Sequence, residues 1–129
     1  MIIDSSALVA ILMAEPESLA FRKLISDRPG CLVPTPVYLE TSMVLIGRKG
    51  TDGVDLLDTF LGEAAIEILP FTADHAVAAS EAFLRYGKDR HRAALNFGDC
   101  MAYAAASVEE MSLLFKGDDF GHTDISPAA

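Results

Sequence analysis

Short apolar segments alternate along this chain with longer segments in which apolar residues recur every three or four positions. The short segments are residues 1–3, 31–33, 66–70 and 113–115. Their brevity and the capping or turn residues beside them are typical of buried strands. Strands that alternate with helices form a parallel sheet with helices on both faces. We therefore expect one three-layer α/β/α domain with a central parallel sheet, spanning residues 1–129.

The segments between these strands predict six helices, at residues 5–13, 15–27, 35–48, 54–61, 73–86 and 96–108. Thr35 precedes Pro36 and is expected to be an N-cap followed by a first-turn proline. Thr72 is expected to cap the fifth helix, and either Asn96 or Gly98 begins the sixth. A further strand around Ile125 would complete the sheet.

Composition excludes several classes of protein. With 51% hydrophobic and 22% charged residues, the chain is not expected to be disordered. No apolar run approaches the roughly 20 residues that cross a bilayer, and no secretory signal is evident, so we expect a cytoplasmic protein without membrane contact. Two cysteines and three scattered histidines do not suggest a disulfide scaffold or a zinc site.

The formal net charge of −9 is unusual for a nucleic-acid-binding protein. One segment is basic although the whole chain is acidic, because it contains Arg85, Lys88, Arg90, His91 and Arg92 close together in the sequence. Such a segment is able to bind phosphate groups, or it is simply a solvated loop.

Acidic residues follow two of the expected strands. Asp4 comes directly after the first strand, and Asp118 and Asp119 come shortly after the fourth. The carboxyl ends of parallel strands lie at one edge of a sheet, where ligands bind near the point at which strand order reverses. These acids are therefore expected at the same edge.

Two more acids lie on helix faces that are otherwise apolar. Glu40 shares a helical face with Val37 and Val44, and Asp99 lies near the start of an alanine-rich helix. Each acid also has a simple structural explanation, as a helix cap, an ion-pair partner or a turn residue. Ionised carboxylates crowded together repel unless a cation compensates them, and an oxygen-only ligand set suits Mg²⁺ or Mn²⁺.

With these acids in place, the sequence resembles the PIN-domain ribonucleases, and among them the VapC-type toxins of bacterial toxin–antitoxin pairs. The resemblance covers nearly the full length. Its carriers are the segments MIIDSSALVAIL, PTPVYLETSMVL, YGKDRHRAALNFGDCMAYAAA and LLFKGDDFGHTDI. It implies an Mg²⁺- or Mn²⁺-dependent endoribonuclease that hydrolyses RNA phosphodiester bonds with metal-activated water.

The resemblance also implies roles for individual residues. Asp4 and Asp99 would be metal ligands, with Glu40 as the third acid, directly or through water. Ser6 would orient Asp4 or a water molecule. Asp118 would be the fourth catalytic acid, although Asp119 fits the pattern as well, and Asp124 also matches the closing motif.

The same resemblance implies partners. Lys88, Arg90 and Arg92 would bind the RNA substrate. A cognate antitoxin would present basic side chains to the acidic pocket, and the protein would be a homodimer.

Other functions stay open at this point. A non-catalytic PIN-fold module for RNA binding or protein interaction would have the same sequence pattern. A metal-dependent phosphatase usually has a second aspartate two residues after the first, where this chain has Ser6. A receiver domain needs an acidic pair after its first strand, where Asp4 stands alone.

Overall fold

Four parallel strands form the centre of the molecule, in a computed structural model that describes residues 1–129. They are β1 (Ile2–Ile3), β2 (Leu32–Pro34), β3 (Glu67–Leu69) and β4 (Leu113–Leu114). Their order across the sheet is β3-β2-β1-β4, and every neighbouring pair is parallel. The predicted parallel sheet is confirmed.

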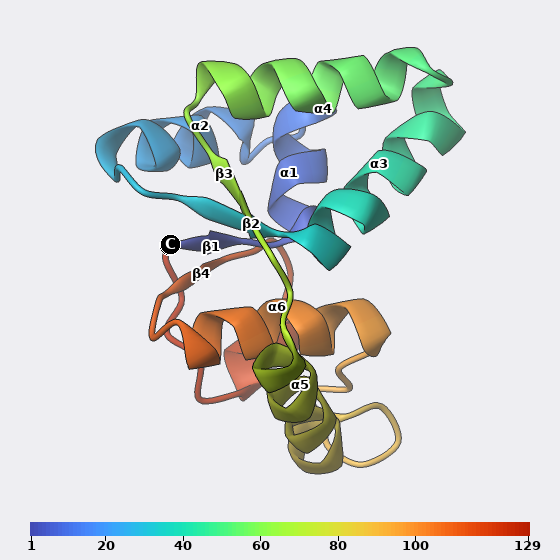
Figure 1. Cartoon of the computed structure of the whole chain (residues 1–129), viewed down its shortest axis with the longest axis vertical. Helices are drawn as coiled ribbons and strands as arrows, with labels where there is room; N and C mark the ends of the chain where they lie inside the picture. Colours follow the sequence, from blue (N-terminus) through green and yellow to red (C-terminus); the bar gives the residue numbers. More distant parts are fainter.

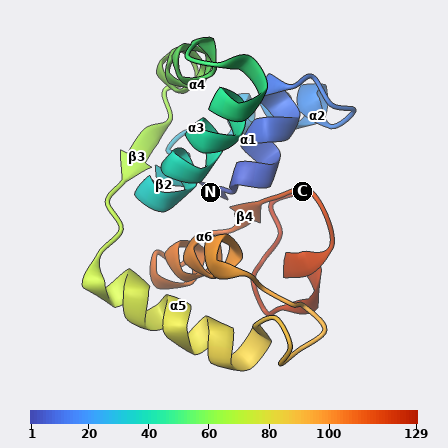
Figure 2. The ribbon, with the colours of Figure 1, turned by 90° about the vertical axis from the view of Figure 1, so that its right-hand side faces the viewer.

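Helices cover both faces of this sheet (Figures 1 and 2). On one face lie α1 (Ser5–Leu12), α2 (Ser18–Asp27), α3 (Thr35–Lys49) and α4 (Asp52–Glu63). On the other lie α5 (Ala73–Tyr86) and α6 (Phe97–Val108), and a short 3₁₀ helix, η1 (Asp119–His122), follows β4. This is the expected three-layer arrangement. None of the helices is both long and apolar enough to span a membrane.

The core explains why the central strands lack the alternating pattern of a half-exposed sheet. Both residues of β1 and both residues of β4 are fully buried, because helices pack on each side of them. In α6, Ala102 and the four residues after it are buried, and the small side chains of the four alanines among them let the helix lie close to the sheet. Burial of a side chain the size of Ile2 contributes about 1.5–3 kcal/mol.

The strand order places a switch point between β1 and β4. From β1 the chain moves outward through β2 to β3, and it then returns to place β4 on the other side of β1. Connections that leave in opposite directions open a crevice at the carboxyl ends of the two strands. The residues after β1 and β4 are therefore neighbours, and Asp4 N–H donates to Leu114 O at 2.9 Å.

Three expectations about local structure are wrong. No strand forms around Ile125, since only an isolated bridge joins Leu113 to Pro127 there. Thr35 does not cap α3: Pro34 occupies the cap position, and Thr35 Oγ1 instead accepts a hydrogen bond from Phe71 N–H. Residues 15–17 form a turn, so α2 begins only at Ser18.

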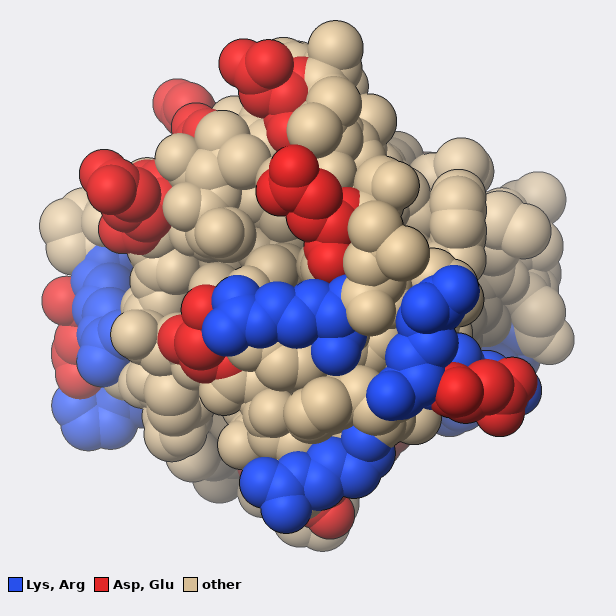
Figure 3. Space-filling view, turned by 90° about the horizontal axis from the view of Figure 1, so that it is seen from below, with Lys and Arg blue, Asp and Glu red and all other residues tan.

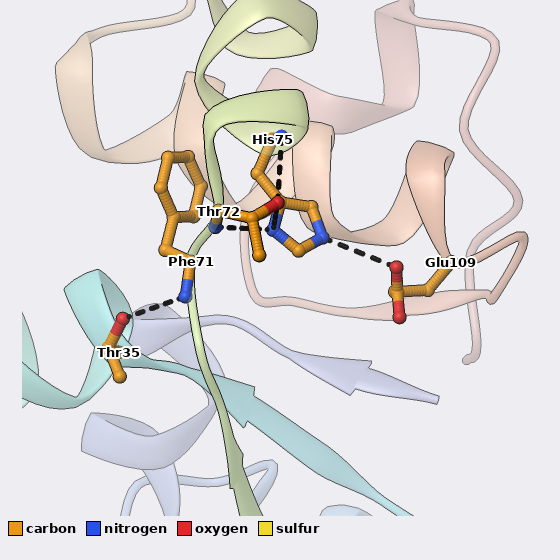
Figure 4. A network of polar contacts seen from close by, with 5 residues as sticks. All are labelled: Thr35, Phe71, Thr72, His75 and Glu109. Carbon is orange, nitrogen blue, oxygen red and sulfur yellow. Dashed lines mark hydrogen bonds and ion pairs between the residues drawn. The ribbon is translucent and has the colours of Figure 1, made fainter.

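A buried histidine joins α5 to the far end of α6 (Figure 4). The Thr72 N–H donates to His75 Nδ1 at 2.9 Å, which leaves the ring proton on Nε2, facing Glu109 Oε2 at 3.3 Å. Thr72 caps α5 as predicted, and its hydroxyl accepts from the His75 N–H. Because α5 packs along α6, this network helps to fix the helix that carries Asp99.

Candidate active site

Asp4 occupies the junction between β1 and α1. It is 3% exposed and is the N-cap of α1. Ser6 donates to Asp4 Oδ2 twice, from its backbone N–H at 3.1 Å and from its hydroxyl at 2.6 Å. Burial raises the pKa of Asp4, the Ser6 hydrogen bonds oppose that effect, and the charge of Glu40 raises the pKa further. Asp4 thus serves as a cap and also lies within the electrostatic field of a second carboxylate.

Glu40 reaches this region from α3. The Ser5 hydroxyl donates to Glu40 Oε1 at 2.7 Å, which ties the carboxylate to the first turn of α1. Its other oxygen, Oε2, lies against Gly98 so closely that a Cβ at that position would overlap with it. A larger residue at position 98 would therefore displace the Glu40 carboxylate from this position. Glu40 is half-buried, not fully enclosed in the core as its position among valines suggested.

Asp99 lies in the first turn of α6. Its N–H donates to Asn96 Oδ1 at 2.9 Å, and its side chain accepts from the Asn96 N–H at 3.1 Å. Burial raises the pKa of Asp99 to about 6, against the opposing Asn96 hydrogen bond, and the charges of Asp4, Asp119 and Glu40 add to the increase. Four acids from separate parts of the chain therefore act on one another.

Of the two acids after β4, Asp119 is the one whose charge raises the pKa of Asp99. Asp118 and Asp119 are both exposed; Asp118 precedes η1 and Asp119 is its first residue. Asp124 accepts a hydrogen bond from the Tyr103 hydroxyl and pairs with Arg85 at 3.3 Å. Which of Asp118 and Asp119 is the fourth acid stays a prediction, and the contacts of Asp124 are with Tyr103 and Arg85.

The carboxylates suit an ion such as Mg²⁺, which keeps several water ligands, better than an ion that is coordinated by protein side chains alone. No three acidic, histidine or cysteine side chains are arranged to hold a metal ion directly. Mg²⁺ commonly uses one or two carboxylates and keeps several water ligands. The raised pKa values of Asp4 and Asp99 show that negative charge is costly here, which is the condition that a bound cation relieves. The donor set fits Mg²⁺ or Mn²⁺.

Basic side chains lie on the face formed by α5 and the loop after it (Figure 3). Lys88, Arg90 and Arg92 are exposed in this loop, which ends at Asn96, the cap of α6. The Arg90 guanidinium lies 5.9 Å from the centre of the Phe83 ring. Acidic side chains are interspersed on the same face, so the positive charge is local.

Sequence reasoning did not identify two polar residues of the site. Ser5 holds Glu40, and Asn96 holds Asp99 through a reciprocal capping box. Asn96 carried a local signal, because an N-cap residue followed three positions later by an acid is a capping-box pattern. The contact of Ser5 joins residues 35 positions apart, and no local pattern announces it.

Comparison with known proteins adds family relationships to this geometry. A family model described as PIN domain matches residues 1–126. Ribonuclease VapC30 of Mycobacterium tuberculosis is 46% identical over 129 residues, covering 100% of this chain and 98% of the relative. Ribonuclease VapC of Mycolicibacterium smegmatis is 46% identical over 126 residues, covering 98% of each chain.

Solved structures share the fold. VapC20 of Mycobacterium tuberculosis, described as a sarcin-ricin loop cleaving toxin, superposes with a TM-score of 0.78 at 17% identity, covering 96% of this chain and 95% of that one. A toxin–antitoxin complex from Klebsiella pneumoniae gives a TM-score of 0.71 at 17% identity, covering 95% and 92%. At this identity the likeness concerns the fold alone.

Proposed function

The chain belongs to the PIN domain family and, within it, to the VapC ribonucleases; from that premise we propose that it is a metal-dependent endoribonuclease, the toxin of a toxin–antitoxin pair. The observation that carries this proposal is the convergence of Asp4, Glu40 and Asp99 at the switch point of the sheet, with burial and mutual repulsion raising the pKa of both aspartates. A site that concentrates negative charge in this way is suited to a divalent cation.

The proposed reaction is hydrolysis of an RNA phosphodiester bond. Mg²⁺ or Mn²⁺ held by these acids would supply the positive charge that lowers the pKa of water and stabilises charge on the phosphoryl group. Asp4 and Asp99 are the proposed ligands. Ser6 holds one oxygen of Asp4 in place, and Glu40 acts directly or through water, oriented by Ser5. Asp119 adds charge on the side of Asp99.

The test is cleavage of an end-labelled RNA by the purified protein in Mn²⁺, in Mg²⁺ and in EDTA. We expect internal cleavage that depends on the metal, and Asp4→Asn should reduce the rate by at least about 100-fold, because a metal ligand is lost. Asp27→Asn is the matched control, since Asp27 is exposed on α2 and pairs only with Lys23. Cleavage that persists in EDTA would contradict the proposal, and release of terminal phosphate without internal cleavage would indicate a phosphatase.

RNA binding is proposed for the loop that contains Lys88, Arg90 and Arg92. These side chains are exposed, and the loop leads directly into the cap of α6, three residues before Asp99. Contacts with phosphates at this place would guide the strand toward the acids. The overall acidity of the chain instead favours a basic partner, and a cognate antitoxin with basic side chains facing the acidic cluster fits that charge.

We also propose a homodimer, formed through an exposed apolar band beside the acids. Leu39 and Met43 on α3 are 59% and 63% exposed, and Phe97 at the start of α6 is 82% exposed. They line a hollow of about 720 Å³ between the two helices. A contiguous apolar surface of this kind is typical of an interface. Sedimentation should show a dimer that Phe97→Glu converts to a monomer, whereas a monomeric wild-type protein would refute this assembly.

A further inference from the structure

Lys116, the second residue after β4, makes contacts in two directions. Its backbone N–H donates to the Ser6 hydroxyl at 3.0 Å. Its side chain pairs with two glutamates, Glu15 Oε1 at 2.6 Å and Glu17 Oε2 at 3.2 Å. One residue therefore connects the active-site edge of the sheet to the turn between α1 and α2.

The Ser6 hydroxyl shows why the backbone contact matters. A hydroxyl has one proton, and here Ser6 Oγ accepts from Lys116 N–H while it donates to Asp4 Oδ2 at 2.6 Å. Because its acceptor side is engaged, the hydroxyl is oriented as a donor to Asp4. Both Ser6 contacts use Oδ2, and neither uses Oδ1 of the same carboxylate.

The turn that receives the ammonium group is well anchored. Glu15 N–H donates to Ala10 O at 2.9 Å, and the buried Ser18 hydroxyl donates to Ile11 O at 3.1 Å. The Glu17 side chain is 36% exposed, and its Oε2 pairs with the Lys116 ammonium group. The Lys116 side chain is 37% exposed, so each ion pair by itself is weak, and what distinguishes this contact is that one ammonium group joins two glutamates of an anchored turn.

The loop held in this way also leads to Asp119. Gly117 follows Lys116 with φ of 104°, a conformation that favours glycine, and the chain then turns into Asp118 and η1. Asp119 begins η1 and acts on Asp99. Fixing Lys116 therefore fixes the start of the segment that brings Asp119 to the site.

We propose that Lys116 is a positioning residue, whose ion pairs with Glu15 and Glu17 hold the loop after β4 so that its backbone orients Ser6 toward Asp4. This inference rests on the proposed ribonuclease function for its kinetic consequence but not for its structural one. Lys116 does not touch substrate in this scheme. Its side chain is occupied by the two glutamates, and it acts through the Ser6 hydroxyl.

The main test compares Lys116→Met with Lys116→Arg in the full chain. Methionine keeps the length and the backbone N–H but removes the charge, whereas arginine keeps the charge. We expect Lys116→Met to lower kcat about tenfold, as loss of an outer-shell contact commonly does, with KM changed by less than about twofold. Lys116→Arg should restore most of the activity. Lys23→Met, which breaks the exposed pair with Asp27 on α2, is the matched control and should leave kcat unchanged.

A readout that does not need activity is hydrogen exchange of the Lys116 amide in metal-free protein. Lys116→Met should speed that exchange about tenfold, because the amide loses its fixed acceptor as the loop loosens. Glu15→Gln combined with Glu17→Gln should have the same effect. If the wild-type protein cleaves no RNA, the ribonuclease proposal fails, while this exchange measurement still decides whether the clamp exists.

A double-mutant cycle separates action through Ser6 from a general loss of structure. If Lys116 acts through Ser6, the effects of Ser6→Ala and Lys116→Met on kcat should be less than additive. Fully additive effects, an unchanged amide exchange rate in Lys116→Met, or failure of arginine to rescue activity would each overturn the inference.

Discussion

Replacing Asp99 by asparagine should make the metal-free protein more stable at neutral pH. Burial and the charges of Asp4, Asp119 and Glu40 raise the pKa of Asp99 from its ordinary 3.8 to about 6. That difference in pKa corresponds to a destabilisation of the folded protein with ionised Asp99 by about 3 kcal/mol. Because Asp99 is only half-buried, solvent screening reduces the expected effect to about 1–2 kcal/mol. Asparagine removes the charge and still offers an oxygen to the Asn96 N–H.

The sign of the pH dependence follows from the raised pKa. Below pH 3.8 Asp99 is protonated in both the folded and the unfolded state, so its charge has no effect on stability. As the pH rises from 3.8 to about 6, the unfolded state releases its proton first, and the free energy of unfolding falls. Above about pH 6 the full destabilisation is present. Asp99→Asn should therefore gain stability over the wild type as the pH increases through this window.

The measurement is thermal unfolding in EDTA between pH 4.5 and 8. At pH 7.5 the Asp99→Asn protein should have a Tm about 3–6 °C higher than the wild type, and it should lose most of the stabilisation that Mn²⁺ gives by mass action. Asp74→Asn is the matched control, because Asp74 is an exposed first-turn acid of α5. It should lose a few tenths of a kcal/mol of favourable helix-dipole interaction. An Asp99→Asn protein that is destabilised like this control, with an undiminished metal effect, would refute the reasoning.

Three further outcomes are expected. Expression of the protein without an antitoxin should arrest bacterial growth, and Asp4→Asn should abolish the arrest; growth curves of the two strains decide this. Replacing both Arg90 and Arg92 by alanine should weaken RNA binding and reduce the slope of log Kd against log salt concentration by roughly 1–2. Fluorescence anisotropy would measure this slope. An unchanged slope would show that these residues belong to a solvated loop that does not bind RNA. His75→Ala should lower the free energy of unfolding by about 1–3 kcal/mol, because it removes a buried side chain and leaves the Thr72 N–H and the Glu109 carboxylate without their partner. Denaturant titration would test this, and no loss of stability would contradict it.

Most secondary structure was predictable because its signals are local. Apolar runs marked the strands, and helical periodicity with caps such as Thr72 and Asn96 marked the helices. The mistakes fall where a distant contact overrides a local preference. Thr35 had the sequence of a cap, yet its hydroxyl is engaged by the Phe71 N–H across the chain. The segment around Ile125 had the composition of a strand but pairs with the sheet only through one bridge.

The convergence of the acids was partly predictable. Parallel strands deliver their following residues to one edge, so the position of Asp4 and of the acids after β4 followed from the sheet alone. Glu40 and Asp99 lie on helices, and their approach depends on how α3 packs against α6. The sequence therefore indicated which acids to consider, while the packing of the helices decided how near to one another they lie.

By itself, then, the sequence determined a parallel α/β/α fold, its family and an acidic edge, because periodicity, capping and residue order are properties of neighbouring positions. Only the tertiary structure decided that Asp119 rather than Asp118 acts on Asp99, and that Ser5 holds Glu40. It also decided that Lys116 pairs with Glu15 and Glu17. These contacts join residues far apart in the chain. Their direction depends on how each loop leaves the sheet, and no short stretch of sequence contains that information.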